Sequence, residues 1–172
     1  MQDIHHLSPN ADDAALAALA EQLARRLLER GLKLACAESC TGGWIAKCLT
    51  DIAGSSDWFE RGFVTYSNSA KQDALGVSAE TLSMHGAVSE QSVREMAVGV
   101  LRHSQAQVAV AVSGIAGPTG GSADKPVGTV WIGWAWPDRS VSVKHCHFDG
   151  DREAVRRAAV AIALQGLVDG LD

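Results

Sequence analysis

The sequence predicts an α/β protein, namely a three-layer α/β/α sandwich with a mixed, mainly parallel sheet and a C-terminal hairpin. Short apolar runs alternate with segments of helical periodicity as far as residue 114, which is typical of helices covering both faces of a parallel sheet. Two later apolar runs, 129–136 and 140–148, flank Pro137-Asp138-Arg139 and predict an antiparallel hairpin. A chain of 172 residues is long enough for one domain with a sizeable core and short for two.

The beginning of the chain predicts a flexible arm over residues 1–10, followed by a single domain over 11–172. A leucine-rich run from Asp12 to Gly31 repeats apolar residues with helical spacing and predicts an amphipathic helix. The next apolar run, 32–37, predicts a buried strand.

Strands and helices then continue to alternate along the chain. A helix is expected over 41–50, a second strand over 62–67 and a short helix near 69–75. Residues 78–104 predict two helices separated by Gly86.

The last part of the chain contains the clearest strand and the longest loop. Residues 107–114 are β-branched and end in glycine, which predicts a buried strand. A glycine-rich loop follows over 114–128, then the hairpin, and a helix over 151–168 ends the domain.

Composition excludes several classes of protein. Hydrophobic content of 47% and charged content of 20% are ordinary for a soluble domain. The net charge of −5 argues against general binding to nucleic acid or anionic membranes. No run reaches the ~20 apolar residues of a membrane span, and the N-terminus lacks the pattern of a secretory signal. We therefore expect a cytoplasmic protein.

The cysteines do not predict a metal site. In a cytoplasmic chain, four cysteines are expected to be reduced thiols. Cys36 and Cys40 lack the C-x2-C spacing of a zinc knuckle. His145 and His147 alternate on one strand face with no third ligand in view. No metal is expected.

Three polar loops follow the three predicted parallel strands. They are AESCTGG (37–43), YSNSAK (66–71) and SGIAGPTGG (113–121). Because ligands bind beyond the carboxyl ends of parallel strands, we expect these loops to gather at one edge of the sheet and form a site.

The first loop offers three side chains that could attack an electrophile, Ser39, Cys40 and Thr41. A hydroxyl needs a neighbouring base, and no histidine lies in the three loops. Lys71 is the candidate base, because burial lowers the pKa of a lysine and a Ser–Lys dyad is a known variant of the catalytic triad. Tyr66 could relay a proton or hold the lysine.

Each of these residues also has a purely structural interpretation, and the spacing alone leaves both open. Ser39 could cap the following helix, and Lys71 could be a solvated helix residue. Tyr66 could be a half-buried strand aromatic, and Glu38 could cap or pair locally. Cys40 has no cation beside it in the sequence and is expected to be a buried packing residue.

Glycines in two of the loops expose backbone N–H groups that could receive an oxyanion or a phosphate. The pattern is neither a P-loop nor a complete G-x-G-x-x-G. Lys125 and two arginines near the start of the last helix, Arg152 and Arg156, could add positive charge toward a phosphate. The arginines could instead pair with Glu153 on the helix surface. The candidate oxyanion- and substrate-binding residues are Thr41, Gly42, Gly43, Ser113, Gly114, Gly117, Gly121, Arg152 and Arg156.

Taken together, the chain resembles the nicotinamide-nucleotide amidohydrolases of the CinA C-terminal domain family. Four segments carry the resemblance: AESCTGGWIAKCLTDIAGSSDWFERGFVTYSNSAK (37–71), HGAVSEQSV (85–93), VSGIAGPTGGSADKPVGTVW (112–131) and GDREAVRR (150–157). The resemblance implies hydrolysis of the carboxamide of nicotinamide mononucleotide (NMN), giving nicotinic acid mononucleotide and ammonia for pyridine-nucleotide salvage. It implies no metal and no other cofactor.

Residue by residue, the family's Ser–Lys pair corresponds to Ser39 and Lys71, and the tyrosine of its YSN segment to Tyr66. Many relatives have threonine where this chain has Ser113, a change that keeps a hydroxyl. The oxyanion would be held near Gly42-Gly43 or near Ser113-Gly114. The phosphate would lie near Gly117–Gly121 and an arginine of 150–157.

Two further expectations concern alternatives and partners. A non-catalytic nucleotide-binding regulatory module is the alternative function, and it would bind the nucleotide without releasing ammonia. NMN is the expected partner, with no nucleic acid and no membrane. Trp131, Trp134 and Trp136 in one predicted strand could provide an apolar surface for a homo-oligomer.

Overall fold

The computed structural model describes residues 11–172, so the arm predicted over 1–10 lies outside the described residues. These residues form a five-stranded sheet in the order β2-β1-β3-β4-β5. The strands are β1 (Leu34–Glu38), β2 (Phe59–Val64), β3 (Val108–Gly114), β4 (Thr129–Ala135) and β5 (Val141–His147).

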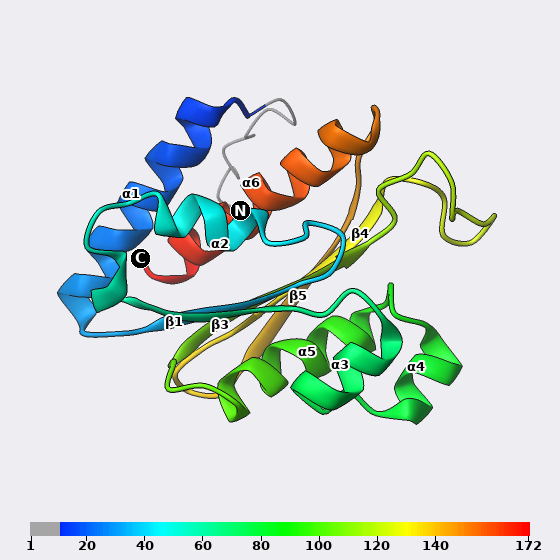
Figure 1. Ribbon diagram of the computed structural model, residues 1–172, viewed down its shortest axis with the longest axis horizontal. Coiled ribbons are helices and arrows are strands. Elements are labelled where there is room, and N and C mark those ends of the chain that lie inside the picture. Colours follow the sequence, from blue (N-terminus) through cyan, green and yellow to red (C-terminus); the bar gives the residue numbers. More distant parts are fainter. Residues whose placement is uncertain (1–10) are drawn as a thin grey trace.

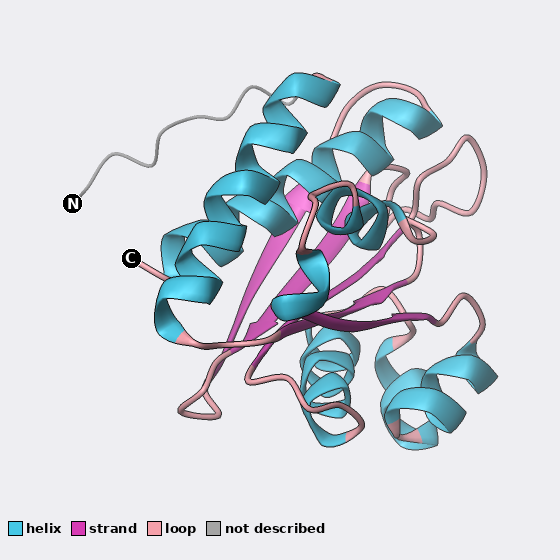
Figure 2. Cartoon of the chain, turned by 60° about the vertical axis from the view of Figure 1, so that its left-hand side comes forward, coloured by secondary structure: helices cyan, strands magenta, loops and turns pink. Residues whose placement is uncertain are grey.

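Helices cover both faces of the sheet, which confirms the three-layer prediction (Figures 1 and 2). One layer consists of α1 (Asp13–Arg30), α2 (Trp44–Thr50) and α6 (Arg152–Gly170). The other consists of α3 (Asn68–Leu75), α4 (Ala79–His85) and α5 (Glu90–Arg102). A short 3-10 turn, Ser55–Asp57, precedes β2. Within residues 11–172, no helix is long and apolar enough to span a membrane.

The sheet is mixed, as predicted. β1 pairs in parallel with β2 and β3, whereas β4 is antiparallel to β3 and β5 is antiparallel to β4. Every described strand except β4 therefore runs in one direction. The β4–β5 hairpin confirms the antiparallel pair expected near the C-terminus.

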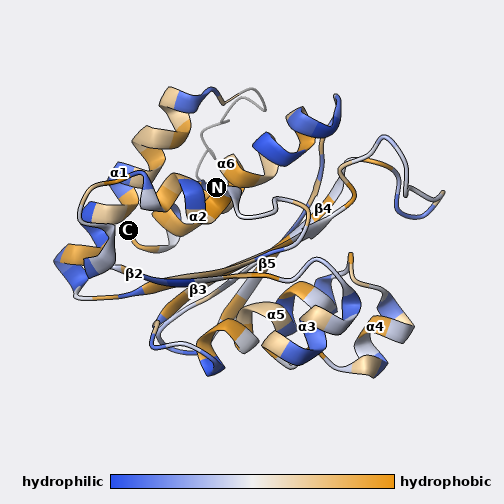
Figure 3. Cartoon of the chain, in the orientation of Figure 1, coloured by the Kyte–Doolittle hydropathy of each residue, from blue (hydrophilic) through white to orange (hydrophobic). Residues whose placement is uncertain are grey.

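The central strands are buried on both faces, which explains why they are continuous apolar runs. Cys36 and Val110 point into the cluster beneath α1, α2 and α6, while Ala35 and Ala111 point into the cluster against α5. Figure 3 shows hydrophobic residues along the sheet and polar ones at the tip of the loop between β3 and β4.

β2 differs most from its prediction, since it spans Phe59–Val64 instead of 62–67. It is an edge strand whose polar residues are largely exposed, so the apolar signal that marks a buried strand is absent at its start. Residues 59–61 were therefore not predicted as part of a strand.

The tryptophans of β4 do not share one surface. Trp131 packs with the cluster on the α5 side, and Trp134 and Trp136 with the cluster on the α6 side. This division follows from the two-residue period of a strand. The expectation of a single tryptophan surface was therefore wrong, and the homo-oligomer stays a prediction.

α6 lies close to β4 because a glycine faces the indole of Trp134. The Trp134 Nε1 donates to the Ala163 carbonyl at 3.0 Å, and a Cβ on Gly166 would lie 2.3 Å from the ring. Close approach of the helix thus requires glycine here.

We predict that Gly166→Ala destabilises the protein by about 1–3 kcal/mol, the usual cost of overpacking a core. This loss outweighs the gain of up to about 1 kcal/mol that alanine brings to a helix interior. Urea denaturation measures the free energy of unfolding, with Gln165→Ala on the neighbouring, partly exposed position as control. A Gly166→Ala variant as stable as the wild type would contradict this packing.

Candidate active site

Residues from all three predicted loops meet in one cavity of about 270 Å³ at the edge of the sheet. Of the predicted site residues, the cavity is lined by Ser39, Tyr66, Lys71, Ser113, Gly114, Gly117 and Arg152. Strand-end geometry therefore brings together parts of the chain more than a hundred residues apart.

At the bottom of this cavity, the Lys71 Nζ donates to the Ser39 Oγ at 3.0 Å and to the Thr65 carbonyl at 2.7 Å. Lys71 is 1% exposed and Ser39 8% exposed. The long lysine side chain thus ends at a buried amine that contacts the candidate nucleophile directly.

Local structure explains how the two groups meet. The Ser67 side chain caps α3 by accepting from the Ala70 N–H at 3.1 Å, which places Lys71 in the first turns of that helix. The Thr65 N–H donates to the Glu38 carbonyl at 2.9 Å, so the chain after β2 stays beside the end of β1. Ser39 follows Glu38 directly and faces α3.

Burial lowers the pKa of Lys71 from its ordinary value of 10.5, because a buried site disfavours the charged amine. None of the ion pairs within residues 11–172 involves this lysine. Without a carboxylate to hold its proton, the amine is suited to act as a base.

Cys40 is not suited to attack. It is 5% exposed, and burial raises the pKa of its thiol to about 11. The reactive thiolate is therefore scarce at neutral pH. Its interpretation as a packing residue is supported.

Glu38 caps α2, which was one of the two structural roles considered for it. Its carboxylate, 1% exposed, accepts from the Ile45 N–H at 2.8 Å and from the Ala46 N–H at 3.1 Å. These bonds fix the start of α2 to the end of β1 and so limit movement of the intervening loop that carries Ser39.

Tyr66 and Arg152 form a pair on the solvent side of the cavity. Tyr66 is 59% exposed, and its hydroxyl accepts from an Arg152 Nη at 2.9 Å. The other Nη of Arg152 donates to the Gly117 carbonyl at 2.8 Å. Tyr66 thus hydrogen-bonds the arginine, and no hydrogen bond joins it to Lys71 within the described chain.

Thr41, Gly42, Gly43 and Arg156 are not brought to this cavity. They line a separate hollow of about 440 Å³ beside Trp44. The backbone is left-handed at both glycines, with φ of 59° and 99°, and it carries the chain into α2 on the opposite face of the sheet from α3. This turn separates the first glycine pair from the dyad.

Arg156 instead holds the loop that follows Ser39. Its Nε donates to the Cys40 carbonyl at 3.0 Å, and an Nη donates to the Thr41 carbonyl at 3.1 Å. Its guanidinium also lies 5.4 Å from the centre of the Trp44 ring. Arg156 thus contacts the loop and does not line the cavity that contains Ser39.

The second glycine segment does face Ser39. Within residues 11–172, the backbone N–H groups of Ala116, Gly117, Thr119 and Gly120 donate to no protein acceptor, and all four residues line the cavity. Gly121 does not line it, and a Cβ at this position would lie 2.7 Å from the Val127 nitrogen. This segment is the better candidate for binding an anion or oxyanion.

Ala87 and Val88, which line the cavity, were not predicted, and four further lining residues were predicted only as part of their loop: Ile115, Ala116, Thr119 and Gly120. The last four belong to the predicted glycine-rich loop, so that loop was the available signal. Ala87 and Val88 are small apolar residues between two helices, and nothing in their chemistry marks them.

The histidines of β5 have local contacts. The His145 ring stacks on Trp131 with centroids 4.7 Å apart, and a ring nitrogen of His147 lies 3.1 Å from the Val127 carbonyl. Among residues 11–172, no three His, Cys, Asp or Glu side chains gather as a metal site.

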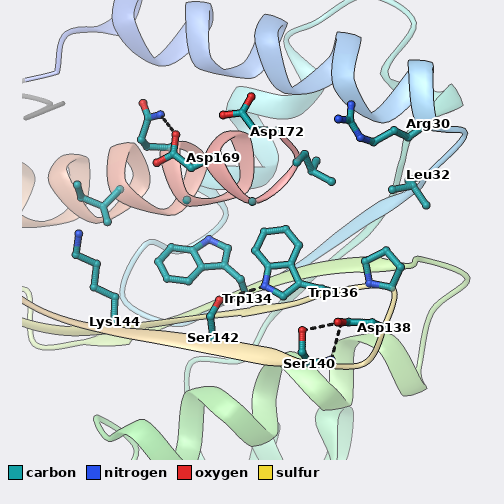
Figure 4. A pocket seen from close by; sticks show the side chains of 16 residues that line it. Arg30, Leu32, Trp134, Trp136, Asp138, Ser140, Ser142, Lys144, Asp169 and Asp172 are labelled. Carbon is teal, nitrogen blue, oxygen red and sulfur yellow. Dashed lines mark hydrogen bonds between the residues drawn. The ribbon is translucent and has the colours of Figure 1, made fainter. Parts of the chain in front are cut away.

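A larger cavity of about 870 Å³ lies between the β4–β5 hairpin and the end of α6 (Figure 4). Trp134, Trp136, Lys144 and Asp169 are among its lining residues. The antiparallel register places it at the opposite end of β4 from Gly114 and the dyad. None of the predicted site residues lines it.

Comparison with known proteins decides the family. The CinA C-terminal domain model matches residues 16–171. The chain belongs to this family. It is 58% identical over 156 residues to a protein of Escherichia coli K12 named nicotinamide-nucleotide amidohydrolase PncC, covering 90% of this chain and 94% of that one.

Other family members agree in sequence and structure. A Pseudomonas putida protein with the same name is 51% identical, covering 87% of this chain and 93% of its own. The crystal structure of the competence/damage inducible protein CihA from Agrobacterium tumefaciens has a TM-score of 0.88 and 46% identity, covering 95% of this chain and 98% of that one. The fold is therefore that of the family.

We predict that Lys71→Met raises the free energy of unfolding at neutral pH, since it removes a buried, unpaired amine. Below the lowered pKa of Lys71 in the folded protein, this lysine is protonated in both the folded and the unfolded state. The folded wild type then carries the full free-energy cost of burying the charged amine. Between that pKa and 10.5 the unfolded state binds more protons, so wild-type stability rises with pH.

Urea denaturation at about pH 7 and about pH 10 should show the stability gap between Lys71→Met and the wild type shrinking as pH rises. Lys33→Met, at an exposed lysine, is the control. A gap independent of pH would show that Lys71 titrates normally.

Proposed function

We propose that the protein hydrolyses the carboxamide of NMN to nicotinic acid mononucleotide and ammonia by a Ser–Lys mechanism, in cytoplasmic pyridine-nucleotide salvage. The observation that carries the mechanism is the buried amine of Lys71, 3.0 Å from the Ser39 Oγ and without an ion-pair partner in residues 11–172. The names of the similar E. coli and P. putida proteins support the substrate.

In the first half of the reaction, neutral Lys71 takes the hydroxyl proton of Ser39 while the Oγ attacks the amide carbon. The carbonyl oxygen becomes an oxyanion. When this tetrahedral intermediate collapses, the C–N bond breaks and Lys71 returns its proton to the leaving nitrogen, which departs as ammonia. An ester of Ser39 remains.

In the second half, Lys71 takes a proton from water, and the resulting hydroxide attacks the ester carbon. Collapse of the second intermediate breaks the bond to Ser39, and Lys71 returns the proton to the Oγ. The product leaves as the carboxylic acid and loses its proton to solvent to become the carboxylate, and serine and neutral lysine are regenerated.

The oxyanion is assigned to the segment after β3. Its free N–H groups line the same cavity as Ser39, whereas Gly42 and Gly43 line the other hollow. Preorganised backbone donors stabilise the charge that develops on the carbonyl oxygen.

The phosphate is assigned to Arg152. This side chain is exposed at the solvent side of the cavity and lacks a carboxylate partner in residues 11–172. Tyr66, by accepting from Arg152, orients the guanidinium. A phosphate there would gain a charge-assisted hydrogen bond.

We predict that Ser39→Ala lowers ammonia release from NMN by about 10³- to 10⁶-fold, the range seen when an enzyme loses its nucleophile. Cys40→Ala should keep turnover of the same order as the wild type, because the Cys40 thiol is protonated. Turnover should persist in a chelator.

Calorimetry of NMN binding completes this test. Ser39→Ala should still bind NMN, since the rest of the cavity is intact. If Ser39→Ala released ammonia at the wild-type rate, the nucleophile assignment would be wrong. If the wild type bound NMN and released no ammonia, the protein would be the non-catalytic nucleotide-binding module.

We predict that Arg152→Gln raises the KM for NMN by about 10- to 100-fold, as expected for a lost hydrogen bond between charged groups. The KM for nicotinamide riboside, which lacks the phosphate, should change little. Steady-state ammonia assays on both substrates provide the comparison. Equal rises for the two substrates would argue against a phosphate contact.

A further inference from the structure

The two walls of the cavity come from segments that are far apart in the chain. One wall is the glycine-rich loop over residues 115–128, and the other is the α4–α5 connection with Ala87 and Val88. Within residues 11–172, one hydrogen bond joins this loop to the chain from α4 to α5: the Lys125 Nζ donates to the His85 carbonyl at 2.5 Å.

The wall formed by the α4–α5 connection is fixed to α5. The Gly86 carbonyl accepts from the Ser89 Oγ at 2.8 Å and from the Ser92 Oγ at 2.7 Å, and Ser92 is fully buried. Ser89 also caps α5 by accepting from the Ser92 N–H. His85 and Gly86 therefore provide a firm anchor.

The glycine-rich loop is held at its base, at one turn, and by the side chains of Arg152 and His147, which bond the Gly117 and Val127 carbonyls. The Ile115 N–H donates to the Thr129 carbonyl at 2.9 Å, and the Gly128 N–H donates to the Ile115 carbonyl at 2.8 Å. The turn is held by Ser122, whose N–H donates to the Lys125 carbonyl and whose Oγ accepts from the Lys125 N–H. The turn aims the Lys125 side chain.

Lys125 itself has no other described role. It takes part in none of the ion pairs of residues 11–172, and it is not among the residues lining the cavity. A cation beside the last carbonyls of a helix is favourable. Its position links the walls without entering the space for substrate.

We propose that Lys125 is a positioning residue for the reaction proposed above. By bonding the His85 carbonyl, it holds the glycine-rich loop at a fixed distance from the α4–α5 connection. The spacing presents the free N–H groups of residues 116–120 to the nucleotide. The substrate in this inference rests on the proposed function, whereas the positioning role rests on the contacts of Lys125.

The first test compares KM and kcat for NMN and for nicotinamide riboside in the wild type and Lys125→Met. Loss of one charged hydrogen bond should raise KM about tenfold for both substrates, and it should also lower kcat, because the displaced N–H groups of the loop are those that hold the oxyanion. Lys125→Arg can still donate to the single carbonyl and should restore most of the wild-type KM.

Lys33→Met is the matched control, since Lys33 is exposed and lies outside the cavity; its KM should equal that of the wild type. A rise in KM for NMN alone would overturn the proposal, because it would show that Lys125 contacts the phosphate. Unchanged KM values for both substrates would also overturn it.

A second test does not depend on turnover. In a Ser39→Ala background, calorimetry gives the Kd for NMN with and without Lys125→Met, and the added change should weaken binding about tenfold. If wild-type protein released no ammonia, the proposed function would fail while this Kd comparison still decided the role of Lys125. An unchanged Kd would overturn that role.

Should Lys125→Met fail to fold, Ser122→Ala replaces it, because this change removes the side-chain bond that aims Lys125. It should raise the KM for both substrates in the same direction and by less. No rise for either substrate would count against the proposal.

Discussion

A lysine amine buried without a negative partner among residues 11–172 is the constraint on which the site depends. Burying a charged ammonium is costly, so the fold favours the neutral amine of Lys71 and must satisfy it with neutral groups. The Thr65 carbonyl and the Ser39 hydroxyl do this at 2.7 and 3.0 Å. In the proposed mechanism, the same burial that costs stability supplies a base next to a nucleophile.

The surrounding structure serves to keep these groups in place. Glu38 joins α2 to β1 through its carboxylate and holds Thr65 through its carbonyl, so one residue fixes both sides of the dyad. Arg156 holds the carbonyls of the loop that follows Ser39. Since positional errors of about 1 Å can be costly in catalysis, such contacts remote from the reacting atoms matter.

Much of this could be predicted from the sequence, because apolar periodicity marks buried strands and polar loops mark their carboxyl ends. That reasoning assembled Ser39, Lys71 and the loop after β3. It could not predict that Gly117 lies in the same cavity as Ser39 whereas Gly42 does not, since left-handed turns decide on which face of the sheet a loop lies. Ala87 could not be predicted, because nothing in the chemistry of an alanine marks it as a cavity residue. The partner of Lys125 could not be predicted either, because a contact with a backbone carbonyl leaves no pattern in residue types.

The proposed mechanism requires Lys71 to act as a neutral base in the folded protein. Titration of its Nζ by NMR, with ¹⁵N-labelled lysine and Lys71→Met to assign the signal, tests this most directly. We expect Lys71 to lose its proton clearly below the ordinary pKa of 10.5. A Lys71 signal that titrates at or above 10.5 would contradict its role as the base.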